Sequence, residues 1–156
     1  MKDIKRILVA IDNEPSGEKV FTAAMQIVPR LHAEVAIVSV TEFDDIIGEA
    51  RSEAAVVSET SSSDSTVTDT IRANIVKRHQ HLIDVLGNNY AVTTFIEEGV
   101  PYEAILKVAS EWGADLIVMG THGRQGLEHL FMGSVAEKVV RHSTIPMLII
   151  PTKPLF

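Results

Sequence analysis

The stretch from Leu116 to Pro151 constrains the fold more than any other part of the chain. A short apolar run ends at Gly120, a loop containing Gly123 follows, and an amphipathic run opens at Gly133 before a last apolar run. This order predicts a strand, a glycine-containing loop, a helix and a strand. A helix start presents unpaired N–H groups to an anion, and glycines let the backbone come close to one. The stretch therefore predicts a phosphate site.

Strand-like and helix-like runs alternate along the rest of the chain. Compact apolar runs rich in β-branched residues predict buried strands, and apolar residues at i, i+3, i+4 and i+7 predict helices packed on them. Such alternation predicts a parallel sheet with right-handed crossovers, whose ligands bind beyond the carboxyl ends of the strands. The predicted strands are Arg6–Ile11, Glu34–Val40, Ala91–Ile96, Leu116–Met119 and Met147–Ile150. Two predicted helices span Thr68–Leu86 and Pro101–Trp112, and two more begin at Ser16 and near Ser134.

The helix ends carry their own signals. Ser16 and Ser134 are predicted N-caps, Pro101 suits a first turn, and Gly113 suits a C-terminal stop. Each helix has a predicted apolar face. These faces are Val20, Ala23, Ala24, Ile27 and Leu31; Ile71, Ile75, Leu82 and Leu86; Ile105, Val108, Ala109 and Trp112; and Val135, Val139 and Val140.

One segment breaks the alternation. Residues 42–67 hold acidic residues, alanines and a serine-rich run, and we expect a mobile insertion there, centred on Glu49–Ser65. The serines fit either a regulatory phosphorylation loop or an ordinary solvated loop. Since the sequence has no repeat, we expect residues 1–156 to form a single domain.

Composition excludes several classes of function. With 46% hydrophobic residues, 156 residues can build one core with two flanking layers. The absence of cysteine excludes disulfides, zinc–thiolate sites and cysteine nucleophiles. A net charge of −7 argues against binding nucleic acid or an anionic membrane, and no apolar run approaches the roughly 20 residues that span a bilayer. No signal-like apolar region precedes the first strand, so we expect a cytoplasmic protein.

The pattern Gly120-x2-Gly123-x9-Gly133-Ser134 resembles the nucleotide-binding pattern of universal stress proteins. Residues 7–12, 118–124, 133–139 and 145–150 also resemble that family, so the likeness covers nearly the whole chain apart from the length of the insertion. The resemblance implies a Rossmann-like, open five-stranded parallel sheet with helices on both faces. It also implies homodimers that pair through the last strand, here Met147–Ile150. Members that keep both loop glycines and the Gly-Ser pair bind ATP, and this chain keeps them.

The resemblance also implies which residues contact the nucleotide. Asp12 lines the adenine side, although it also suits a water-mediated metal contact or a cap, and Val40 binds adenine through its main chain unless it is only a core residue. Gly120 and Gly123 wrap the phosphates, or serve tight turns, and Arg124 reaches the phosphates unless it is simply a surface arginine. The full predicted set is Ala10, Ile11, Asp12, Val40, Met119, Gly120, His122, Gly123, Arg124, Gly133, Ser134 and Val135.

The chemistry expected at this site is binding. The sequence has no GxxxxGK[ST] motif and no identifiable general base beside the phosphates, so we predict no catalytic residue. His79 and His81 are two residues apart, do not share a helical face, and predict no metal site. We expect a nucleotide-dependent stress-response switch holding ATP with Mg²⁺ or Mn²⁺. The alternatives are a slow ATPase or nucleotidyl-transfer enzyme, and an interaction protein that binds no nucleotide.

Overall fold

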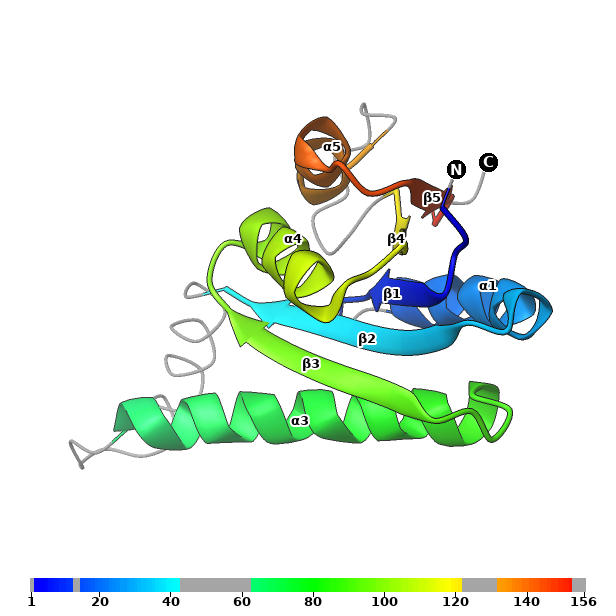
Figure 1. Ribbon diagram of the computed structural model, residues 1–156. Coiled ribbons are helices and arrows are strands. Elements are labelled where there is room, and N and C mark those ends of the chain that lie inside the picture. Colours follow the sequence, from blue (N-terminus) through cyan, green and yellow to red (C-terminus); the bar gives the residue numbers. More distant parts are fainter. Residues whose placement is uncertain (1, 13–14, 43–62, 122–131, 153–156) are drawn as a thin grey trace.

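The computed structural model describes residues 2–12, 15–42, 63–121 and 132–152. Strands and helices alternate as the sequence predicts, with labels as in Figure 1. The strands are β1 (Arg6–Ala10), β2 (Glu34–Thr41), β3 (Val92–Glu98), β4 (Leu116–Gly120) and β5 (Met147–Ile150), and the helices are α1 (Ser16–Leu31), α3 (Ser63–Leu86), α4 (Pro101–Trp112) and α5 (Ser134–His142).

The five strands form one parallel sheet in the order β3-β2-β1-β4-β5. Helices α1 and α3 cover one face and α4 and α5 cover the other (Figure 1). The chain first moves outward from β1 to β3 and then returns to the other side of β1, so the strand order reverses between β1 and β4. The predicted open, Rossmann-like α/β fold is confirmed, and its topological switch point lies between β1 and β4.

Apolar residues of β1 divide between the two faces of the sheet. Ile7 and Val9 pack with Phe21 of α1, while Leu8 packs on the opposite side with Val108 of α4. All five side chains are buried. This alternation is the period of two expected of a strand covered on both faces.

The boundary of α3 corrects the predicted insertion. The helix begins at Ser63, not at Thr68, so the last part of the segment 42–67 is helical. The reason is that Val67, 4% exposed, packs with Ile71 and Ile75 and so belongs to the apolar face of the helix. The rest of the insertion, residues 43–62, lies outside the described residues.

The helix ends agree with some predicted signals and correct others. Pro101 is in the first turn of α4, and Gly113 ends that helix with a φ of 75°, as predicted. Ser16 and Ser134 are not N-caps: Pro15 and Gly133 hold those positions, and neither helix start has a side-chain capping bond.

Two predicted members of the apolar faces are wrong. Leu31 is 42% exposed because α1 ends there, in the left-handed turn at His32. Val140 is 45% exposed because successive helix residues differ by about 100° and its neighbour Val139 takes the buried position.

Candidate functional site

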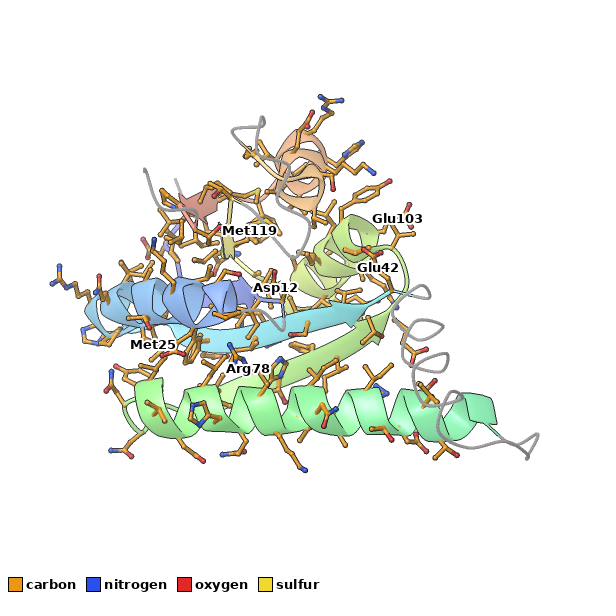
Figure 2. The ribbon with its side chains drawn as sticks, turned by 180° about the vertical axis from the view of Figure 1, so that it is seen from behind. Asp12, Met25, Glu42, Arg78, Glu103 and Met119 are labelled. Atoms are coloured by element: carbon orange, nitrogen blue, oxygen red, sulfur yellow. The ribbon has the colours of Figure 1, made fainter. Side chains whose placement is uncertain are left out.

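The candidate site lies at the carboxyl edge of the sheet, around the switch point. Asp12 follows β1, Glu42 follows β2 and Thr121 follows β4, so three chain segments leave the sheet on the same edge. Figure 2 shows Asp12 and Glu42 at the ends of their strands along this edge. Ligands of open α/β sheets bind in this region.

Val40 directs its main chain past the end of β1. The carbonyl of Val38 accepts the N–H of Ile11 at 3.0 Å, and residues two apart in a strand point their peptide groups to the same neighbour. The last residue pair between β1 and β2 is Ala10 with Val38. The N–H and C=O of Val40 therefore point to the β1 side at a level where β1 has already ended.

Asp12 is held by the first turn of α1. The hydroxyl of Ser16 donates to its Oδ1 at 3.2 Å, instead of capping the helix as predicted. A Cβ added to Gly17 would lie 2.9 Å from the carbonyl oxygen of Asp12, so α1 approaches this peptide as closely as glycine allows. Asp12 thus has a fixed main chain and a half-buried side chain that is oriented from the helix.

Thr121 connects the end of β4 to β5 and to the start of α5. Its N–H donates to the carbonyl of Ile150 at 2.9 Å, and its own carbonyl accepts the N–H of Gly133. The N–H of Gly133 is therefore used within the protein. Helix geometry leaves the N–H groups of Ser134, Val135 and the following residue without acceptors inside α5.

Gly120 is required by packing and not by a turn. It is the last residue of β4, and an added Cβ would lie 2.6 Å from Thr152 Cγ2 and 3.1 Å from Val20 Cγ2. A side chain at this position would press on both neighbours. The glycine brings β4 close to α1 at the switch point.

A groove of about 400 Å³ lies between the starts of α4 and α5. This volume is within the range of small-molecule sites. Two of the predicted contact residues, Ser134 and Val135, line it. The ammonium of Lys138 lies 5.4 Å from the centre of the Tyr102 ring and joins the two walls. The remaining lining residues are Glu42, Gly99, Val100 and Pro101.

Six residues that line this groove were not among the predicted contact residues, although two signals identify three of them. The six are Glu42, Gly99, Val100, Pro101, Tyr102 and Lys138. Glu42 and Gly99 follow β2 and β3 directly, so the rule that ligands bind beyond the carboxyl ends of the strands applies to them. Lys138 lies four residues after Ser134 and therefore on the same face of α5.

The other predicted site residues are distributed around this edge. Ala10 and Met119 are paired in register, buried, and packed on the α4–α5 face, while Ile11 is buried on the α1 face. His122, Gly123 and Arg124 lie outside the described residues. Among the described residues, no three His, Asp or Glu side chains gather as a metal site would require. In the same part of the chain, every helix is too short or too polar to cross a membrane.

A buried histidine near this edge was not predicted. His79 of α3 is 2% exposed, and its Nε2 lies 2.8 Å from the hydroxyl of Ser39 on β2. Burial lowers the pKa of His79 from 6.5 to about 4, because the charged ring would lose its hydration. The imidazole is therefore neutral at pH 7. The exposed His81 takes no part in this arrangement.

Comparisons with known proteins converge on one family. The model of the universal stress protein family matches residues 3–151. The protein SH1215 of Staphylococcus haemolyticus is 31% identical over 164 residues, which cover 99% of this chain and 89% of that protein. Universal stress protein MJ0577 of Methanocaldococcus jannaschii is 39% identical over 64 residues, which cover 41% of this chain and 40% of that protein.

Solved structures agree on the fold. That of MJ0577 gives a TM-score of 0.80 at 23% identity and covers 98% of this chain and 99% of the other. A universal stress protein in complex with cAMP gives a TM-score of 0.62 at 21% identity and covers 97% of this chain and 100% of the other.

Proposed function

The chain belongs to the universal stress protein family, and from this membership we propose that it binds an adenine nucleotide, ATP above all, at the carboxyl edge of its sheet. The main chain of Val40 carries the proposal. Adenine has an acceptor at N1 beside a donor at N6, and a peptide N–H next to a C=O on one strand edge is the complementary pair. Guanine reverses both groups on that edge.

The start of α5 supports the phosphate half of the proposal. Its first-turn N–H groups, which have no acceptor inside the helix, and the positive end of the helix dipole favour an anion, and Ser134 is exposed there with its hydroxyl. Lys138 adds a positive charge to the groove beside it. A family relative in complex with cAMP supports a nucleotide as the ligand class.

The same arrangement favours a switch over an enzyme. A polyphosphate on a chain of net charge −7 benefits from Mg²⁺ or Mn²⁺, and phosphate oxygens and water would supply most of the ligands of such an ion. Since the sequence identifies no general base beside the phosphates, we propose nucleotide-dependent stress signalling with at most slow ATP hydrolysis.

Calorimetric titration of the protein with ATP, GTP, AMP and cAMP, with and without Mg²⁺, tests the proposal. We expect one ATP per chain, GTP at least ten times weaker, and negligible ADP formation over hours. Equal affinity for ATP and GTP would contradict the role of Val40. Absence of binding by any of the four would refute the nucleotide function in favour of an interaction protein.

We further propose that two copies pair through β5. This strand is at the edge of the sheet, and Leu148 is 37% exposed. The carbonyls of Pro146 and Ile150 face β4, so the peptide groups of Ile149 face the free edge. Ile149→Pro removes one outward N–H and should shift the mass measured by light scattering from dimer to monomer, while Ile149→Ala should stay dimeric. A wild-type monomer would refute the pairing.

A further inference from the structure

The buried contact between α3 and the sheet lies next to the candidate nucleotide site. His79 Nε2 is 2.8 Å from Ser39 Oγ, and Ser39 Oγ donates to the carbonyl of Ile11 at 3.0 Å. Ile11 is the residue before Asp12. The chain of hydrogen bonds therefore runs from α3 through β2 to the peptide that carries Asp12.

The direction of these bonds follows from the number of protons. A serine hydroxyl has one proton, and Ser39 uses it toward Ile11. The Nε2 of His79 must then be the donor to Ser39. Because the pKa of His79 is lowered to about 4, the ring is neutral and its other nitrogen, Nδ1, holds a lone pair. Among the described residues Nδ1 has no hydrogen-bond partner, so Nε2 makes the only hydrogen bond of the ring in this part of the chain.

We propose that His79 is a positioning residue for the nucleotide site, which fixes the Ile11–Asp12 peptide through the hydroxyl of Ser39. The carbonyl of Ile11 and the N–H of Asp12 belong to one planar peptide, so holding the carbonyl sets the direction of the N–H and the start of the Asp12 side chain. The inference rests on the proposed adenine-nucleotide function.

The position of α3 explains which kind of side chain can make this contact. Figure 2 shows Arg78, the residue next to His79, on the side of α3 that faces the sheet. Ser39 is 2% exposed, and the surroundings of α3 are otherwise apolar at Ile75 and Leu82. A long side chain that is neutral, and that ends in a donor, is needed to cross from the helix to a buried hydroxyl.

The experiment measures ATP affinity by calorimetry in four variants. His79→Leu removes the donor and Ser39→Ala removes the relay, and each should weaken ATP binding about tenfold. The double variant should bind no more weakly than either single one. His79→Gln restores an N–H donor at a similar reach and should return the affinity to within about threefold of wild type.

A matched control separates positioning from stability. Ile75 is buried one turn before His79 on the same helix and takes no part in the hydrogen-bond chain, so Ile75→Ala should lower the melting temperature and leave ATP affinity within twofold. The Asp12 amide resonance of the ligand-free protein gives a second readout. His79→Leu should shift it, and Ile75→Ala should not.

The outcomes separate this inference from the proposed function. Wild-type protein that binds ATP, with His79→Leu binding equally well, overturns the role of His79 alone. Equal losses in His79→Leu, His79→Gln and Ile75→Ala also overturn it, because they indicate a purely structural effect. Wild-type protein that binds no adenine nucleotide refutes the proposed function, and the role of His79 in it.

Discussion

The two sides of the switch point are built differently. The β1–β2 side comprises Asp12, Ser39, His79 and their contacts. Ser39 and His79 are each 2% exposed, and their hydrogen bonds hold the carbonyl of Ile11. The β4–α5 side comprises the described residues from Thr121 to Ser134. There Ser134 is exposed at the start of α5, and the N-cap Gly133 provides no side-chain capping bond. Changes on the first side should therefore alter stability and binding together, whereas changes on the second should alter binding alone.

Acidification should have the largest effect on folding stability, and it should act through His79 on the β1–β2 side. The native pKa of His79 is about 4 and the unfolded value about 6.5, so between these values the unfolded state binds a proton that the native state does not. Stability therefore falls as the pH drops from 6.5 to 4, by about 3 kcal/mol in all, of which about 2 kcal/mol is lost by pH 5. Urea denaturation of wild type and His79→Gln at pH 7 and pH 5 measures it.

The glutamine variant is the control, since it cannot take up the proton. Its stability should change far less than that of wild type between the two pH values. Carboxylates such as Asp115, whose pKa is lowered by its hydrogen bonds with Lys2 and Lys5, lose their contribution only at lower pH. Equal losses in both proteins would show that His79 does not titrate in this range.

A negative charge at the start of α5 should have the next largest effect. Ser134→Glu places a carboxylate where the phosphates would bind, and we expect ATP affinity to fall ten- to a hundredfold, about 1.4 to 2.7 kcal/mol. Folding stability should stay within about 0.5 kcal/mol, since the charge suits the helix dipole. Gln26→Glu adds the same charge at an exposed position of α1 and should leave binding unchanged. Calorimetry measures the ATP affinity of both variants, and thermal melting measures their stability. A loss of stability in Ser134→Glu without a loss of ATP affinity would contradict the expected difference between the two sides.

Gly17→Ala should have an intermediate effect, and it should lower folding stability where this substitution in a helix normally raises it. Alanine normally stabilises a helix by about 1 kcal/mol relative to glycine. Here its Cβ would come within 2.9 Å of the Asp12 carbonyl, and the overlap should outweigh this gain and leave a net loss of about 1 kcal/mol. ATP affinity should fall severalfold, because the same peptide must move. A more stable variant with normal binding would show that α1 can shift without disturbing Asp12.

The contrast also explains what sequence reasoning could reach. The strand and helix order, Pro101 and Gly113 are local signals, and they were predicted correctly. The contact between His79 and Ser39 joins residues 40 positions apart, and no local pattern marks it. Serine is a common N-cap residue, but in the folded chain the carboxylate of Asp12 lies within reach of Ser16. The hydroxyl of Ser16 therefore donates to Asp12 and does not cap the helix. The glycine pattern predicts a site in this region, whereas the packing that requires glycine at position 120 depends on Thr152 and Val20 and could not be predicted.

Ser16→Ala should give the smallest effect and the sharpest test of how Asp12 is supported. The hydroxyl of Ser16 donates to Asp12 Oδ1 at 3.2 Å in a half-buried setting, so its loss should cost about 0.5 to 1 kcal/mol of stability. We expect only a twofold loss of ATP affinity, because Ser39 and Gly17 still hold the main chain on either side of Asp12. Thr22→Ala removes another hydroxyl of α1, one that donates to the carbonyl of Glu18, and should leave ATP affinity unchanged. If Ser16→Ala instead weakened ATP binding tenfold, the side chain of Asp12 would matter more for binding than its main chain. The hydrogen bond from Ser39 to Ile11 would then be secondary.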